Sequence, residues 1–453
     1  MMNCPTRYLL VITLALAGCK QAPSTQRLAD STPPDTAWVA SSALYEVFVE
    51  DFSPSGTIRG VIEGLDRIKA LGTNVLWVMP IHPRGMANRK GTLGSPYAAR
   101  DYRAIDSAYG TAADFHALVD AVHARGMKII LDWVPNHTAW DNVWVTEHPD
   151  FYTRNAGGGL TVPADAQGKP TDWTDVAELN YANPALRQAM LETMQYWLRE
   201  YNLDGFRVDV AGFVPYDFWR EAVPALRASV PRRILLLAEW GDLEMHRVGY
   251  DLTYGWDGYS RLKAVWKGDS AVTFVRQAMV EADSMPAGGM RLRFTTNHDE
   301  TSWDKPPVTL FGGPDGARAA FVAMTLLPGR PMIYNGQEVE SPQVLNLFVH
   351  QPVEWNQPQA DSTRAFYAKV VGLARDSAIA GRPLTSVETG AGKDVIAYAR
   401  GDVTVLVNTR GSPVRFAVVG VSGARDLLSE TLQQSDTVAL GPFDMRVFRT
   451  AHQ

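Results

Sequence analysis

Short apolar runs recur along the chain and alternate with longer amphipathic stretches. Residues 112–125 and 184–200 carry apolar side chains at helical spacing, which is typical of helices that bury one face. Runs of four to seven mostly apolar residues predict strands at 44–49, 75–80, 128–134, 205–210, 234–240, 291–296 and 331–334. This alternation of strands and helices predicts a parallel sheet whose two faces are both covered.

A weaker run at 251–256 brings the number of predicted strands to eight, which is the number in a (β/α)8 barrel. An open, doubly wound sheet is the alternative, and periodicity alone does not separate the two. We predict an α/β fold in which a (β/α)8 TIM barrel occupies residues 39–381.

Two segments depart from this alternation. Residues 138–177 contain three consecutive glycines and several prolines without a helical period, which predicts a short inserted loop subdomain after the third strand. From residue 382 onward, short β-rich runs are separated by turn residues. These runs predict a C-terminal antiparallel β-sandwich over residues 382–453.

The N-terminus has the pattern of an export signal. Arg7 precedes an apolar run at 8–17, which is too short to span a membrane. The string Leu-Ala-Gly-Cys that ends at Cys19 resembles the bacterial lipobox, whose cysteine is lipidated after cleavage. We expect a signal peptide over 1–18 and a flexible tether over 19–38 that is anchored to a membrane through Cys19. A plain secretory peptide is the alternative.

By the same resemblance, Lys20 after the cysteine favours an outer-membrane location, on either its periplasmic or its cell-surface face.

Composition narrows the classes of function. Hydrophobic residues make up 46% and charged residues 20%, which is typical of a globular chain. The net charge of −6 argues against a nucleic-acid partner, because such proteins carry a basic excess. The two cysteines, Cys4 and Cys19, lie outside the predicted body, so they supply neither a zinc site nor an intrachain disulfide there. Aromatic residues make up 10%, which suits a ligand with flat apolar faces, such as a sugar.

Three carboxylates follow apolar runs at the ends of predicted strands: Asp209, Glu239 and Asp299. In a (β/α)8 barrel these strand ends face the active site. Burying three carboxylates costs too much free energy to serve structure alone. Further polar side chains end the same strands or their neighbours: His137, Arg207 and His298. The set therefore indicates an active site.

Retaining glycoside hydrolysis needs this set of groups. One carboxylate acts as the nucleophile and a carboxylic acid protonates the leaving oxygen. Arg207 lies two residues before Asp209, on the same strand face, so it can keep Asp209 ionised. Glu239 ends a very apolar run, which favours the protonated form that a general acid requires.

Four strings carry a family resemblance: DWVPNH (132–137), GFRVDVAG (205–212), LLAEW (236–240) and FTTNHDE (294–300). In order and spacing they resemble the signature regions of the α-amylase superfamily, glycoside hydrolase family 13. The resemblance implies that Asp209 is the nucleophile and Glu239 the acid/base. It also implies sugar-binding or positioning roles for Tyr97, His137, Arg207, His298 and Asp299, and a bracing role for Asp132.

No cofactor is implied for the chemistry. Asn136 matches a calcium ligand of the family, so a structural calcium ion is one expectation and a turn-forming role for Asn136 is the other. Tryptophans near the inserted segment, Trp133, Trp140, Trp144 and Trp173, are expected either to line sugar subsites or to lie in the core.

The sequence departs from many α-amylases after the nucleophile. Gly212 and Phe213 stand where those enzymes carry a Lys-His pair. The DVA string at 209–211 and the VAELN string at 176–180 look more like neopullulanases and cyclomaltodextrinases. Glu178 differs even from those relatives, which carry Lys or Asp at that position. These departures imply an open or small-substrate site.

The expected activity is hydrolysis of α-1,4-glucosidic bonds in maltooligosaccharides, starch or cyclodextrins. A transglycosylase that uses the same site is the first alternative. A non-catalytic starch-binding lipoprotein is the second, although such a protein is expected to lose catalytic carboxylates that this chain keeps.

Overall fold

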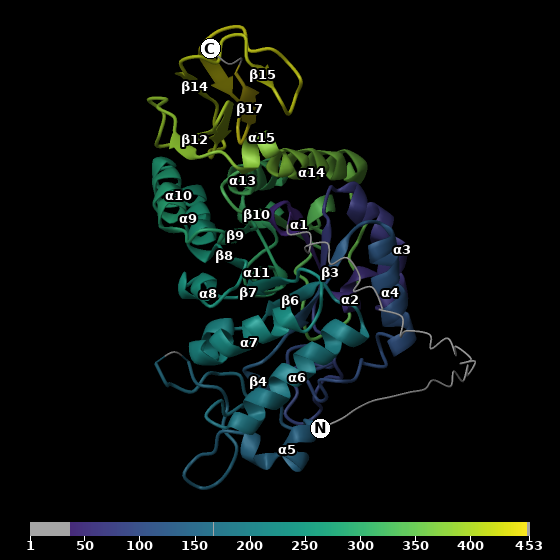
Figure 1. Ribbon diagram of the computed structural model, residues 1–453. Helices are drawn as coiled ribbons and strands as arrows, with labels where there is room; N and C mark the ends of the chain where they lie inside the picture. Colours follow the sequence, from purple (N-terminus) through teal and green to yellow (C-terminus); the bar gives the residue numbers. More distant parts are fainter. Residues whose placement is uncertain (1–36, 166, 451–453) are drawn as a thin grey trace, which may run out of the picture. The chain divides into compact units, whose positions relative to one another are not determined.

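The computed structural model describes residues 37–165 and 167–450 (Figure 1). In this part of the chain, eight parallel strands close into a barrel in the order β1-β10-β9-β8-β7-β6-β3-β2. The barrel strands are β1 (Leu44–Val47), β2 (Val75–Val78), β3 (Lys128–Trp133), β6 (Gly205–Val208), β7 (Leu235–Ala238), β8 (Leu252–Tyr254), β9 (Met290–Arg293) and β10 (Arg330–Tyr334). Because β1 pairs with both β2 and β10, the sheet has no edge. The predicted barrel is confirmed, and the open sheet is excluded.

Longer helices follow the barrel strands. They are α3 (Ile58–Ala70), α4 (Ala112–Ala124), α6 (Pro184–Glu200), α7 (Tyr216–Ala228), α9 (Trp256–Trp266), α10 (Val272–Ser284), α13 (Pro314–Thr325) and α14 (Ala360–Arg375). Local sequence sets their starts. Thr111 and Asp114 form a reciprocal capping box at the start of α4, and Asn183 caps α6 just before a proline at its first position.

Shorter helical turns complete the barrel connections: α1 (Ala37–Ala40), α2 (Val49–Phe52), α8 (Glu244–Arg247), α11 (His298–Trp303), α12 (Pro307–Leu310), α15 (Ser377–Ala380), η2 (Ala211–Phe213) and η3 (Gln337–Val339). The helix α1 falls at the end of the predicted tether, and Trp38 packs against the barrel core. The predicted signal peptide, Cys19 and the tether up to residue 36 lie outside the described residues. Among the described residues, no helix is both long and apolar enough to cross a membrane.

The inserted segment after β3 forms a small substructure. Its short strands β4 (His137–Ala139) and β5 (Val176–Glu178) pair antiparallel, so the two ends of the insertion lie side by side. Between them lie α5 (Val143–Glu147) and the turn η1 (Pro149–Phe151). These elements are too short to show a helical period in the sequence.

The C-terminal strands form two antiparallel sheets. They are β11 (Leu384–Ser386), β12 (Val395–Arg400), β13 (Val403–Asn408), β14 (Val414–Ala417), β15 (Arg425–Asp426), β16 (Thr437–Leu440) and β17 (Met445–Arg449). The sheet of β11, β12, β13, β17 and β15 shares a hydrophobic core with the pair β14–β16, through contacts of Leu406 and Phe448 with Phe416 and Val438. This arrangement agrees with the predicted antiparallel sandwich.

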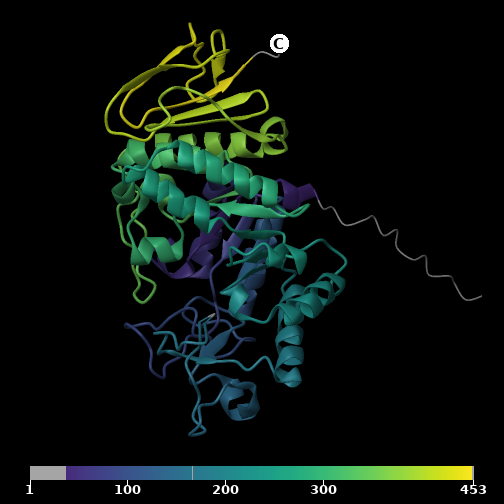
Figure 2. The same ribbon diagram turned by 90° about the vertical axis from the view of Figure 1, so that its left-hand side faces the viewer.

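The other face of the five-stranded sheet packs on the barrel helices. Figure 2 shows these strands beside the helices that precede them in sequence. The Tyr398 hydroxyl donates to the carbonyl oxygen of Ala323 in α13, and the Arg400 guanidinium donates to the Leu326 carbonyl oxygen. Tyr398 belongs to the barrel's hydrophobic cluster, so this sheet and the barrel share a core.

Candidate active site

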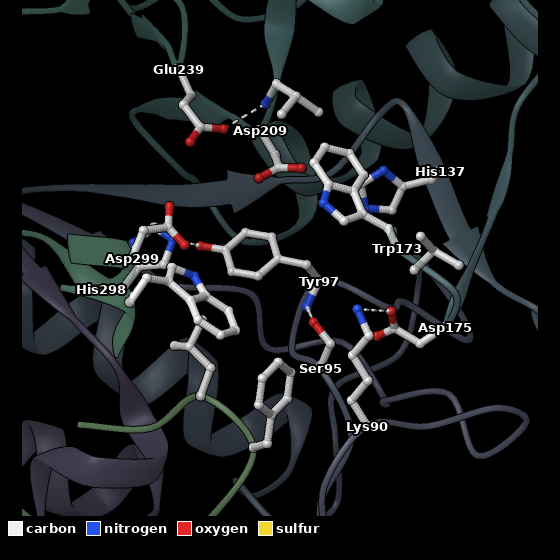
Figure 3. A pocket seen from close by; sticks show the side chains of 15 residues that line it. Lys90, Ser95, Tyr97, His137, Trp173, Asp175, Asp209, Glu239, His298 and Asp299 are labelled. Carbon is white, nitrogen blue, oxygen red and sulfur yellow. Dashed lines mark hydrogen bonds and ion pairs between the residues drawn. The ribbon is translucent and has the colours of Figure 1, made fainter. Parts of the chain in front are cut away.

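The carboxyl ends of the barrel strands surround a cavity of about 300 Å³ (Figure 3). Its walls include most of the residues that the sequence singled out: Tyr97, His137, Asp209, Glu239, His298 and Asp299. Asp209 and Glu239 follow β6 and β7, and their backbone N–H groups still donate to the neighbouring strands at Trp133 and Val208. The backbone hydrogen bonds of the barrel therefore fix the main-chain positions of Asp209 and Glu239.

Arg207 is fully buried behind this cavity and joins three carboxylates. Its Nη1 lies 2.8 Å from Asp132 Oδ1 and 2.9 Å from Asp209 Oδ1. Its Nη2 lies 3.0 Å from Glu239 Oε2. One rigid guanidinium fork therefore sets the relative position of Asp209 and Glu239.

Val210, directly after Asp209, has a strained backbone. Its φ is +35° and its ψ is +47°, in the left-handed region that β-branched residues rarely adopt. In this conformation the Val210 N–H donates to Glu239 Oε2 at 2.7 Å. The same carboxylate oxygen thus accepts a backbone hydrogen bond and contacts Arg207, which fixes the orientation of Glu239.

The two central carboxyl groups have perturbed protonation. Burial raises the pKa of Glu239, and Arg207 partly offsets this effect. Burial also raises the pKa of Asp209 well above its usual value, and the neighbouring Glu239 charge adds to this. Because each charge disfavours the other, the pair holds one proton over a pH range in which free carboxyl groups hold none. One proton and one charge on two carboxyl groups is the state that a retaining glycosidase requires.

A second group of contacts lies beside this pair. The Tyr97 hydroxyl donates to Asp132 Oδ2 at 3.0 Å and lies 2.8 Å from His298 Nε2. His298 Nε2 also lies 3.2 Å from Asp299 Oδ2. Burial alone would raise the pKa of Asp299, but the charge of His298 lowers the pKa overall, so Asp299 is ionised. Tyr97 is fixed by these contacts with its ring in the cavity wall.

His137 and Trp173 form another wall, and an aromatic row extends from Trp173. Burial lowers the pKa of His137 to about 3, so this imidazole is neutral. Its ring centroid lies 5.5 Å from that of Trp173, which stacks on Phe213 at 5.9 Å. Phe213 in turn meets Trp240, the residue after Glu239, at 5.4 Å. An added Cβ at Gly212 would lie 2.1 Å from the Trp240 ring, so only glycine fits beside it.

Of the four tryptophans named from the sequence, only Trp173 lines this cavity in the described residues. Trp133 is fully buried in the core, and Trp140 and Trp144 are partly buried against that core.

Sequence reasoning missed several cavity residues from the loops, among them Lys90, Ser95, Asp175, Trp303, Leu347 and Phe348. Lys90 Nζ and Asp175 Oδ1 form an ion pair at 3.2 Å between two loops that are distant in sequence. No local pattern marks such residues. Glu46 was also missed, although a lone carboxylate inside an apolar strand run was a signal that could have found it.

The expected calcium site finds little support. No group of three or more His, Cys, Asp or Glu side chains in the described residues is arranged to hold a metal ion. The Asn136 amide lies 3.3 Å from His137 Nδ1, and its backbone carbonyl accepts from Leu179. Ca²⁺ takes six to eight oxygen ligands, which include amide and backbone carbonyl oxygens as well as carboxylates. A calcium ion at Asn136 therefore stays a prediction.

Comparisons with known proteins agree with this geometry. The family model described as "Alpha amylase, catalytic domain" matches residues 25–240. The crystal structure of an α-amylase from Lactobacillus plantarum is 31% identical, with a TM-score of 0.80, and the match covers 91% of this chain and 99% of that one. The structure of a noncanonic maltogenic α-amylase from Thermotoga neapolitana is 27% identical over the same shares of the two chains, also with a TM-score of 0.80.

Among curated proteins, the probable oligo-1,6-glucosidase 2 of Bacillus subtilis (strain 168) is 32% identical over 204 residues, which are 38% of this chain and 35% of that protein. The match therefore spans about a third of that relative's length. The fold, the ordered site and the structural match over 91% of this chain define the class of protein. The chain belongs to the α-amylase family of glycoside hydrolases, as its four signature strings predicted.

Proposed function

We propose that this chain is a retaining α-glucan hydrolase that cleaves α-1,4-glucosidic bonds in maltooligosaccharides, starch or cyclodextrins. The observation that supports this most directly is the Arg207 fork, which holds Asp209 and Glu239 together at the cavity wall. A sugar in this cavity meets an ionised and a protonated carboxyl group side by side.

The proposed reaction has two steps. The Asp209 carboxylate attacks the anomeric carbon while Glu239 gives its proton to the departing glycosidic oxygen, which leaves a glycosyl ester on Asp209. Glu239, now a carboxylate, then takes a proton from water as the water oxygen attacks the same carbon and releases Asp209. The configuration is inverted twice and is therefore retained.

Other side chains would bind the sugar. Asp299 is ionised and lies beside His298, so both can hydrogen-bond sugar hydroxyls while the carboxylate charge stabilises the cationic transition state. The Tyr97 ring supplies a flat apolar surface for the sugar bound at the nucleophile. Neutral His137 adds a further hydrogen-bonding group.

The experiment is product analysis by chromatography. The purified enzyme is incubated with maltoheptaose, pullulan and γ-cyclodextrin side by side, with Asp209→Asn as the matched control. We expect cleavage of at least one substrate with retained configuration and a loss of at least about a thousandfold in the variant. Near wild-type turnover in Asp209→Asn would refute the mechanism. No cleavage of any substrate by folded protein would favour the starch-binding alternative.

The same substrates define the specificity. Rapid opening of cyclodextrin together with cleavage of pullulan would support the neopullulanase-like interpretation of the DVA and VAELN strings. Cleavage of maltoheptaose alone would point to an enzyme that acts on linear maltooligosaccharides.

Glycosyl transfer is the second candidate, and the aromatic row favours it. Trp173, Phe213 and Trp240 lie next to the acid/base, where an incoming sugar would displace water from apolar rings. At high maltotriose concentration, products longer than the donor would establish transfer, whereas glucose and maltose alone would establish hydrolysis.

The export and anchoring predicted from the N-terminal sequence are part of the proposal. We expect the chain to be lipidated at Cys19 and held at the outer membrane. Fractionation of cells that express the full chain tests this. A Cys19→Ser variant should appear in the soluble fraction, and membrane association that persists in the variant would refute the anchor.

A further inference from the structure

Glu46 is a fully buried carboxylate in β1, a strand whose other members are apolar or aromatic. Its Oε1 lies 2.5 Å from His298 Nδ1. Its Oε2 is buried without a hydrogen-bond partner among the described residues. A buried carboxylate whose second oxygen lacks a hydrogen-bond partner costs free energy. Packing alone therefore does not explain a glutamate at position 46.

The contacts of His298 fix its protonation. Nδ1 faces the Glu46 carboxylate, which can only accept a hydrogen bond when ionised. Nε2 faces the Asp299 carboxylate and the Tyr97 hydroxyl oxygen. The Tyr97 proton is already donated to Asp132, so the Tyr97 oxygen accepts from Nε2. Both ring nitrogens therefore face acceptors, and the ring satisfies them only as an imidazolium.

Several charged or titratable groups face this ring from different elements. They are Glu46 from β1, Tyr97 from the loop after β2, Asp132 at the end of β3, Glu239 after β7 and Asp299 from α11. Arg207 from β6 acts on the Glu46 carboxyl group and lowers its pKa. Glu46 is the one that meets Nδ1, on the side away from Tyr97 and Asp299.

We propose that Glu46 is a positioning residue that keeps His298 doubly protonated and aims its Nε2–H at Asp299 and Tyr97. The catalytic consequence of this proposal rests on the proposed function, in which the Asp299 carboxylate hydrogen-bonds the sugar hydroxyls. Burial alone would lower the pKa of His298, but Asp299 and Glu46 together raise it well above its usual value. Asp299 is then held ionised and oriented across the pH range in which the enzyme works.

The test is Glu46→Gln, which keeps the shape of the side chain and an acceptor oxygen but removes the charge. The matched control is Glu338→Gln. Glu338 is also fully buried, but it accepts from the Tyr45 hydroxyl at 2.7 Å and from the Gly336 N–H at 3.0 Å, outside the cavity wall. Calorimetry on both variants checks folding.

The decisive readout is the titration of His298 by nitrogen NMR on histidine-labelled protein. The chain has nine histidines, so a His298→Gln spectrum assigns the resonance. We expect His298 to stay doubly protonated from pH 5 to 9 in the parent and in Glu338→Gln, and to lose its proton within that range in Glu46→Gln. A neutral His298 in the parent at pH 7, or an unchanged titration in Glu46→Gln, would overturn the proposal.

Kinetics supply the catalytic half of the test. We expect kcat/KM of Glu46→Gln to fall by at least about tenfold at pH 8 and by less at pH 5.5, where the ring keeps its proton without help. A loss of equal size at both pH values would assign Glu46 to packing alone. Because the NMR titration needs no substrate, it distinguishes failure of this proposal from failure of the proposed activity.

Discussion

Replacing Arg207 with lysine is the sharpest test of how Asp209 and Glu239, the two proposed catalytic carboxyl groups, are held. The Arg207 Nη1 lies 2.8 Å from the Asp132 carboxylate and 2.9 Å from that of Asp209, and Nη2 lies 3.0 Å from that of Glu239. A lysine keeps the positive charge but has a single ammonium group. The ammonium group can contact either the Asp132 and Asp209 pair or Glu239, so at least one buried carboxylate loses its cation.

The size of the effect follows from these contacts. A buried hydrogen bond to a charged group contributes about 1.5–3 kcal/mol, so Arg207→Lys should destabilise the fold by about that amount. Since about 1.4 kcal/mol corresponds to one pKa unit, the carboxyl group that loses its cation should gain about one to two units. Arg207 lowers the pKa of both Asp209 and Glu239, so at least one limb of the pH profile of Arg207→Lys should move to higher pH.

The assay is kcat/KM from pH 4 to 9 on a chromogenic maltooligosaccharide, with Tm measured at each pH. The control is Arg293→Lys, because Arg293 is 1% exposed and pairs with Glu281 outside the cavity wall. The control should lower Tm and leave the pH profile unchanged. An Arg207→Lys profile within about 0.3 pH unit of the parent would refute the idea that one guanidinium sets both protonation states.

Three further predictions concern the walls and the stability of the site. Trp173→Ala removes a ring of the cavity wall and should raise KM about tenfold with kcat within about threefold; an unchanged KM would show that the ring does not touch substrate. Val210→Gly should relieve the left-handed backbone strain, so that the free energy of unfolding rises by up to about 1 kcal/mol and Tm rises with it. Its kcat should fall, because the hydrogen bond from the residue 210 N–H to Glu239 is held less firmly. A lower Tm would contradict the strain. EDTA should leave Tm unchanged, and a drop that calcium restores would reveal a metal site that the described residues do not supply.

The barrel strands were predictable because both of their faces are buried. Parallel strands of this kind form continuous apolar runs, and the run at 128–134 matches β3 at Lys128–Trp133 within one residue. Runs that extended past a strand by two residues or more did so at its carboxyl end. The run at 234–240 continues beyond Ala238. The Glu239 backbone still donates to Val208 while its side chain lines the cavity, and Trp240 belongs to the aromatic row.

The loop-built walls were not predictable for a physical reason. Lys90 and Asp175 meet across two connections, and Trp303 and Phe348 approach at 6.0 Å from two others. These contacts depend on tertiary closure of the barrel, which no local period encodes. Asn136 was expected either to bind calcium or to form a turn, and the calcium ion stays a prediction. In the structure Asn136 contacts His137 and Leu179.

The charges around the cavity explain why two cations lie close to Asp209, the proposed nucleophile. The buried cations are Arg207 and the His298 imidazolium, and the anions are Asp132, Asp299, Glu46 and the single charge shared by Asp209 and Glu239. Burial raises the pKa of Asp132 and Glu46, and the charges of Arg207 and His298 partly offset this effect. When both carboxyl groups are ionised, this set carries two more negative than positive charges. An excess of negative charge suits a transition state in which the anomeric carbon becomes positive. Without the two cations, the carboxylates would bind further protons and the excess of negative charge would be lost. Arg207 and His298 therefore keep the carboxylates ionised and the site negative.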